Sequence, residues 1–132
     1  MKKILRLPIT ILPGDYTIFR LDSGSKLPDW VDTSRFYSIT DTGEECTVIC
    51  SGEAVPEEYP HECSMKIFKI NKNLKFNETG IINSITTPLA ESEIPVFVLS
   101  TFDTDYFFIK MEHAYKAVEI LGKHHDVDYY SW

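Results

Sequence analysis

Polar residues that could bind a small molecule gather in one stretch of the chain, residues 76–111. Glu78 and Gly80 stand where a helix is expected to begin, and Asp103 and Asp105 stand between two apolar runs that predict a tight hairpin. The free N–H groups at a helix N-terminus bind carboxylates, and carboxylate side chains accept hydrogen bonds from ammonium groups. A zwitterion, such as a free amino acid, carries both of these charges.

Two further residue types fit this chemistry. Gly80 has no Cβ, so a ligand can approach its backbone, and Phe102 could stack on an aliphatic stem or on a cation. Each feature also has an ordinary structural explanation. Glycine and aspartate are common in turns, and glutamate in a first helical turn is favoured by the helix dipole.

The elements that would position these residues can be predicted from hydrophobic periodicity. Strands are expected at 64–70, 95–101 and 104–110, with helices at about 79–93 and 112–121 and a tail that adds a strand or docks an aromatic cluster. The two nearly continuous apolar strands, 95–101 and 104–110, indicate burial on both faces, or on one face and an interface. The apolar stripe of the first helix comprises Ile81, Ile82, Ile85, Leu89 and Ala90, and that of the second comprises Ala114, Ala117, Val118 and Leu121. Pro88 should bend the first helix, because it removes the backbone hydrogen bond to Ser84.

The first half of the chain reads as strand pairs. Strands are predicted at 4–12 and 16–21, with turn residues at 13–15, and Pro8 places the first of them at a sheet edge or at a bulge. Residues 35–40 and 46–51 predict a hairpin, and residues 22–34 a loop with one helical turn around Pro28 to Val31. Residues 52–63 are rich in proline and glutamate, which is typical of a linker.

Composition excludes several classes of function. The chain has 132 residues, enough for one compact domain or two very small ones, and a net charge of -7 that argues against binding a nucleic-acid backbone. No apolar run approaches the length of a membrane span, and the first 12 residues lack the pattern of a signal peptide. We therefore expect a cytoplasmic protein. Its three cysteines are unlike a disulfide framework.

The reactive residue types are interpreted as structural. Cys46 and Cys50 face one side of a strand, and their spacing to His61 and Cys63 matches no standard zinc pattern. His124 and His125 follow a predicted helix end, where a cationic imidazole is mildly favourable. No nucleophile elbow, phosphate loop or HExxH motif is present. The chain is therefore expected to be no enzyme and to need no cofactor or metal.

The stretch FNETGIINSITTPLAESEIPVFVLSTFDTDYFFI resembles the ligand-binding half of ACT-domain proteins, and RFYSITDTGEECTVICSGEAVP resembles another segment of the same family. The similarity is to the branch that includes short bacterial proteins with two ACT-like units and an arginine sensor of the TOR-complex pathway. It implies an α+β fold of tandem ferredoxin-like βαββαβ ACT units, antiparallel sheets with helices packed on one face. Residues 1–58 would form a degenerate N-terminal unit and residues 64–132 the C-terminal ACT unit.

The same resemblance implies a non-catalytic regulatory protein that senses an amino acid bound between ACT units. The residues implied to bind the ligand are Glu78, Gly80 and Ile81 at the helix start, Thr101, Phe102, Asp103 and Asp105 in the hairpin, and Ile70 and Asn71 from an adjoining unit. The animal sensor has four ACT units and this chain two, so a homodimer would restore four. Two other hypotheses stay open: a ligand-free interaction or dimerisation module, and a small enzyme that uses Cys63 or His61.

Overall fold

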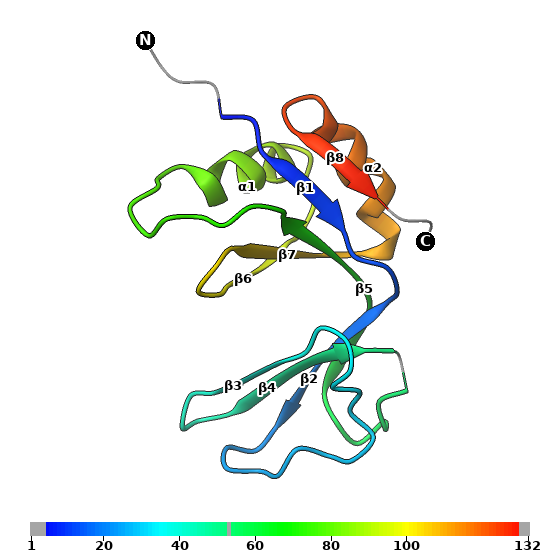
Figure 1. The fold of residues 1–132 in the computed structure, drawn as a ribbon. Helices are drawn as coiled ribbons and strands as arrows, with labels where there is room; N and C mark the ends of the chain where they lie inside the picture. Colours follow the sequence, from blue (N-terminus) through cyan, green and yellow to red (C-terminus); the bar gives the residue numbers. More distant parts are fainter. Residues whose placement is uncertain (1–4, 53, 130–132) are drawn as a thin grey trace. The chain divides into compact units, whose positions relative to one another are not determined.

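The computed structural model describes residues 5–52 and 54–129, and the chain divides into two compact units (Figure 1). The smaller unit is Gly14–Met65, and the larger unit combines Met1–Pro13 with Lys66–Trp132. Strand β5 (His61–Ile70) contributes its first residues to the smaller unit and its last residues to the larger one. No helix among the described residues is both long enough and apolar enough to cross a membrane.

The larger unit has the predicted α+β architecture. After β5, the chain forms α1 (Ile81–Glu91), β6 (Phe97–Ser100), β7 (Asp105–Lys110), α2 (Met111–Gly122) and β8 (Asp126–Tyr129), which gives the βαββαβ order. Strand β1 (Pro8–Ile11) lies between β5 and β8, antiparallel to the first and parallel to the second. The strand order is therefore β6-β7-β5-β1-β8. The strand predicted at 4–12 thus belongs to the sheet of the larger unit.

Pro8 does not mark a sheet edge, contrary to the prediction. It is the first residue of β1, which has partners on both sides. A proline at the start of a strand is tolerated because its missing N–H removes no bond from the middle of the ladder. The Pro8 carbonyl still accepts a hydrogen bond of 2.8 Å from the Asn71 N–H.

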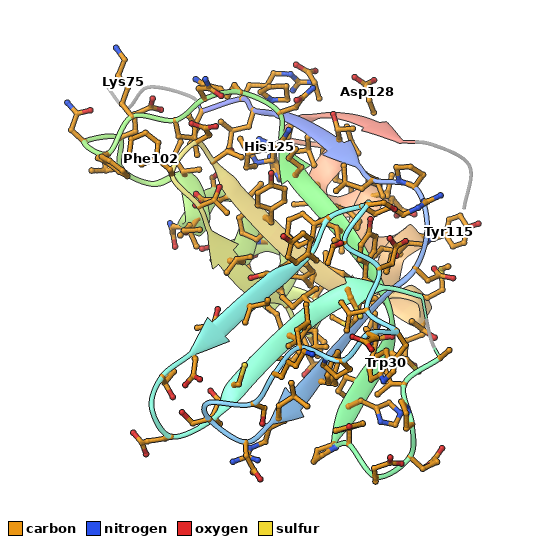
Figure 2. All side chains as sticks on the ribbon, turned by 60° about the horizontal axis from the view of Figure 1, so that its bottom comes forward. Trp30, Lys75, Phe102, Tyr115, His125 and Asp128 are labelled. Atoms are coloured by element: carbon orange, nitrogen blue, oxygen red, sulfur yellow. The ribbon has the colours of Figure 1, made fainter. Side chains whose placement is uncertain are left out.

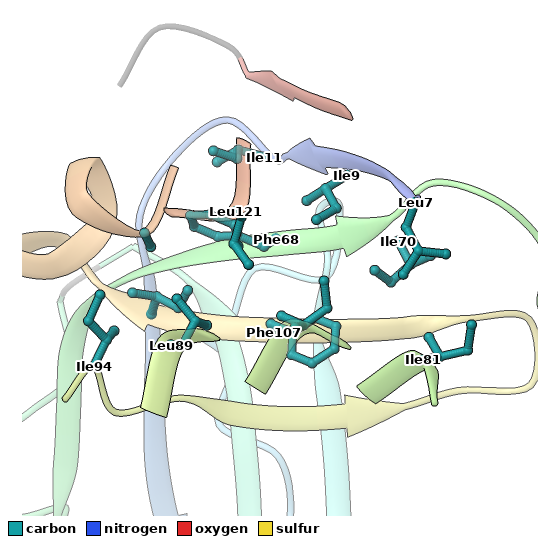
Figure 3. Close-up of a cluster of buried hydrophobic side chains, with 13 residues drawn as sticks. Leu7, Ile9, Ile11, Phe68, Ile70, Ile81, Leu89, Ile94, Phe107 and Leu121 are labelled. Atoms are coloured by element: carbon teal, nitrogen blue, oxygen red, sulfur yellow. The ribbon is translucent and has the colours of Figure 1, made fainter. Parts of the chain in front are cut away.

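The core of the larger unit lies between this sheet and the two helices (Figure 3). Helix α1 buries Ile81, Ile85 and Leu89, at the predicted spacing of three to four residues. The prediction of a buried stripe is wrong for two of its residues, since Ile82 is 40% exposed and Ala90 is exposed. Helix α2 buries Ala114, Ala117 and Leu121, and Val118 packs against the same core.

Strand β6 is an edge strand, so burial on both faces is wrong for it, whereas burial on one face and against an interface stays a prediction. It pairs with β7, and its side chains Phe97 and Val98 are 51% and 40% exposed. Strand β7 is internal, between β5 and β6, and there Phe107, Phe108 and Ile109 are buried as predicted. Internal strands and edge strands can have the same apolar sequence pattern. The exposure of such a strand is therefore set by its position in the sheet.

The smaller unit is an antiparallel sheet in the order β3-β4-β2-β5, formed by β2 (Tyr16–Leu21), β3 (Ser38–Asp41), β4 (Cys46–Ser51) and the start of β5. The predicted hairpin between β3 and β4 is confirmed. Cys46 and Cys50 are buried in one cluster with Phe19 and Val48. Where a helical turn was predicted around Pro28 to Val31, the structure has a turn that is not part of a helix, with a bond of 3.2 Å from the Val31 N–H to the Pro28 carbonyl.

Candidate functional site

A hollow of about 280 Å³ lies in the larger unit where the loop before α1, the first turn of α1 and the β6–β7 hairpin tip meet. We call it the α1 hollow. Its lining comprises Leu74, Lys75, Phe76, Glu78, Gly80, Ile81, Ile82, Asn83, Thr101, Phe102, Asp103, Thr104 and Asp105. Every ligand residue predicted from the sequence lines it, except Ile70 and Asn71. Its volume is near the lower end for small-molecule sites, which suits a metabolite smaller than a drug.

Backbone and ring contacts hold the two walls of the hollow together. The Leu74 N–H donates to the Asp103 carbonyl at 2.7 Å, which ties the loop to the hairpin tip. The rings of Phe76 and Phe102 meet edge to face, with centroids 5.2 Å apart. Figure 2 shows Lys75 and Phe102 at this end of the unit. Residues far apart in sequence therefore line one surface.

The first turn of α1 supplies hydrogen-bond donors. Gly80 is the N-cap, and its φ of 77° is a left-handed backbone conformation that residues with a Cβ rarely adopt. No side chain caps this end of the helix. The Gly80 carbonyl accepts from the Ser84 N–H at 3.0 Å. The N–H groups of residues 81–83 precede this first intrahelical bond, and within the described part of the chain they donate to no acceptor. Free donors at the positive end of a helix dipole favour a bound anion.

The hairpin and loop supply carboxylates. Asp105 is only 9% exposed, and its Oδ1 accepts from the Ser100 hydroxyl at 2.6 Å. Glu78 Oε1 accepts from the Lys75 N–H at 3.0 Å. Asp103 is exposed, and the described residues show no hydrogen bond to its carboxylate. Each acid therefore keeps at least one oxygen for a further donor, while Asp105 is already oriented by Ser100.

Ile70 and Asn71 lie outside the α1 hollow. The Ile70 side chain is fully buried, and its carbonyl accepts from the Thr104 hydroxyl at 2.7 Å. Asn71 lines a second hollow of about 250 Å³, which shares the hairpin tip and also contains Lys69, Lys72 and Tyr106. Burial and the neighbouring Asp103 carboxylate raise the pKa of Tyr106.

Sequence reasoning missed several lining residues. Lys75, Phe76 and Asn83 were not singled out, because the loop before the helix read only as polar and Asn83 lies off the apolar stripe. An aromatic residue inside a polar loop next to a helix start was the available signal for Phe76. Asn83 carries no comparable signal, since only the fold brings it to the hollow.

Comparison with known proteins agrees with this architecture. The ACT-domain family model matches residues 61–123, and a second model, for an N-terminal domain, matches residues 14–58. The human cytosolic arginine sensor for mTORC1 subunit 1 is 24% identical over 104 residues. That match covers 70% of this chain and 32% of the sensor, so the chain corresponds to about a third of that relative.

Two solved structures extend the comparison. A protein from Agobacterium tumefaciens is 31% identical, with a TM-score of 0.87 over 97% of this chain and 96% of that one. Aspartate kinase from Clostridium acetobutylicum is 11% identical, with a TM-score of 0.61 over 85% of this chain and 33% of the kinase, and so shares the fold. This chain belongs to the ACT-domain family, and it resembles the cytosolic arginine sensor.

Proposed function

We propose that this protein is a non-catalytic regulatory protein that binds an amino acid in the α1 hollow. ACT domains generally bind amino acids in regulation, and a distant relative is named an arginine sensor. The observation that carries the proposal is the meeting of free helix N–H donors and oriented carboxylates in one hollow. The name of that relative also supports a cytoplasmic location.

The α1 hollow offers a complementary group for each part of an amino acid. Its carboxylate would accept from the N–H groups of residues 81–83, and its ammonium, or a cationic side chain, would donate to Asp105 and Asp103. Phe102 would lie against the ligand side chain. A hydrogen bond to a charged group is worth about 1.5–3 kcal/mol. Two or three of them, less the cost of immobilisation, are in keeping with micromolar binding, about 8 kcal/mol.

A homodimer is the second part of the proposal, with the ligand held where ACT units of two copies adjoin. The exposed apolar edge strand β6 supports it, because such an edge invites pairing with another chain. Asn71 and the backbone of Ile70 are then the contributions of the adjoining copy. Residues 14–65 would serve as the degenerate second unit of each chain.

A ligand-free interaction module is the alternative function. Phe76 and Phe102 favour it, since these rings are 81% and 79% exposed. Two aromatic rings in mutual contact and open to solvent form an apolar patch of the kind found at protein interfaces.

A thermal-shift screen with the twenty amino acids tests the proposed function. A ligand that binds only the folded state raises the melting temperature as its concentration increases. We expect one amino acid, or one chemically related group, to raise it in this way. If no amino acid at millimolar concentration shifts the transition, sensing is refuted and the interaction module takes its place.

A further inference from the structure

Pro88 leaves a gap in the hydrogen bonding of helix α1. A proline inside a helix has no N–H, so the carbonyl four residues earlier, that of Ser84, loses its intrahelical partner. The Nε2 atom of His125 lies 3.3 Å from that Ser84 oxygen. His125 comes from the turn between α2 and β8, so a residue distant in sequence fills the gap.

The other ring nitrogen of His125 has a different partner. Its Nδ1 accepts a hydrogen bond of 3.1 Å from the Leu7 N–H, directly before β1. Because Leu7 can only donate and the Ser84 carbonyl can only accept, the imidazole must be neutral, with its proton on Nε2. The side chain is only 2% exposed. One neutral ring thus joins α1 to the start of β1.

We propose that His125 is a proton-sensitive positioning residue, which holds helix α1 to the start of β1 only while its imidazole is neutral. Protonation would place a second hydrogen on Nδ1, facing the Leu7 N–H. Two donors would then meet, the bond from Leu7 would break, and a charge would be buried. This proposal does not depend on which ligand the α1 hollow binds, or on whether it binds one.

The surroundings of the ring oppose a positive charge. Burial is the main cause that lowers the pKa of His125 below its ordinary 6.5, and His124 and Arg6 lower it further. The hydrogen bond to Ser84 and the Asp126 carboxylate act in the opposite direction, but Asp126 is also paired with Arg6 at 2.8 Å. A hollow of about 470 Å³ lies beside the ring, and Glu91 of α1 is one of the residues that line it.

The sign of the pH effect follows from the lowered pKa. The unfolded chain binds a proton at about 6.5 and the folded chain only at lower pH, so the unfolded state holds more protons in between. The contribution of His125 to stability is therefore present above pH 6.5. It is lost as the pH falls below that value and through the folded pKa.

Loss of the contact between His125 and helix α1 should also affect the first turn of that helix. The Ser84 N–H donates to the Gly80 carbonyl, and Asn83 lines both the α1 hollow and the hollow beside His125. The peptide groups that flank Ser84 therefore connect the helix start to the imidazole. Amide protection at residues 84 and 85 reports on this connection directly.

The first test is an NMR titration of the full chain that follows the imidazoles of His125 and of the exposed His124. We expect the His125 imidazole to titrate below the ordinary histidine pKa of 6.5, because burial disfavours its charged form. We also expect amide protection factors at residues 84 and 85 to fall about tenfold on acidification through that transition. If His125 titrates at or above pH 6.5, or protection does not change, the proposal is overturned.

Variants separate positioning from general acid sensitivity. Pro88→Ala restores an N–H that can donate to the Ser84 carbonyl, so protection at residues 84 and 85 should become insensitive to the state of His125. His125→Gln removes the titrating group, so the fall in melting temperature between about pH 7.5 and about pH 5 should shrink, whereas His124→Gln should keep it. An unchanged acid response in both Pro88→Ala and His125→Gln would contradict the proposal. The titration of the wild-type chain decides the matter if His125→Gln does not fold.

Discussion

Replacing Asp105 by asparagine isolates the charge of the most enclosed carboxylate in the α1 hollow. The side chain is almost isosteric, and its amide oxygen can still accept the 2.6 Å hydrogen bond from Ser100. Alanine is a poorer probe, because it would leave the Ser100 hydroxyl without this acceptor. Alanine would therefore change the charge and a hydrogen bond at the same time.

The expected loss of affinity follows from this geometry. If the asparagine oxygen stays on Ser100, its NH₂ group points to the position where the ligand ammonium should lie, so a donor replaces an acceptor. Loss of one charge-assisted bond, about 1.5–3 kcal/mol, weakens binding about 10- to 150-fold. The free energy of unfolding should change by less than about 1 kcal/mol, because the packing and the Ser100 bond are kept.

Calorimetric titration with the amino acid found in the screen measures this loss. Glu119→Gln is the matched control, since it makes the same change of charge at an exposed position on α2 outside the hollow. We expect the control to bind as the wild type does. If Asp105→Asn binds within about twofold of the wild type, Asp105 does not contact the ligand and the site has been assigned to the wrong residues.

Two more predictions concern the helix start and the sheet edge. Gly80→Ala should lower the free energy of unfolding by about 1–2 kcal/mol, because φ is 77° although no atom lies within 4 Å of the added Cβ; chemical denaturation measures this, and an unchanged midpoint would contradict the assigned conformation. Val98→Lys places a charge on the exposed edge strand, so it should convert a wild-type dimer to a monomer in light scattering while circular dichroism shows that the chain stays folded. A wild type that is monomeric at every concentration would rule out the dimer.

Local patterns predicted most elements because local physics sets them. Strands β2 and β4 have the predicted ends, and both helices lie within two residues of theirs. Helix α1 begins at Ile81 rather than at the predicted Thr79, since the left-handed backbone of Gly80 cannot continue a helix. Turn residues at 41–45 correctly predicted the β3–β4 hairpin, because its two strands are neighbours in sequence.

Strand neighbours and exposure were not predictable in this way. Ile9 pairs with Ile70, and Pro8 is aligned with Asp126, so β1 enters the sheet through partners far along the chain. An apolar run does not say whether a strand will be internal, as β7 is, or at an edge, as β6 is. These outcomes depend on which long-range pairings bury the most apolar surface, and no local pattern records that.

For the candidate site, the sequence by itself determined the chemistry. It placed a glycine and a glutamate at a helix start and aspartates in a hairpin, because turns and helix ends require such residues. Only the tertiary structure decided that these segments share one hollow and that Ser100 orients Asp105. It also decided that His125 donates a hydrogen bond to the Ser84 carbonyl, which Pro88 leaves without an intrahelical partner. Hydrogen bonds and packing between distant segments form only when the whole chain has folded, so their partners cannot be read from neighbouring residues.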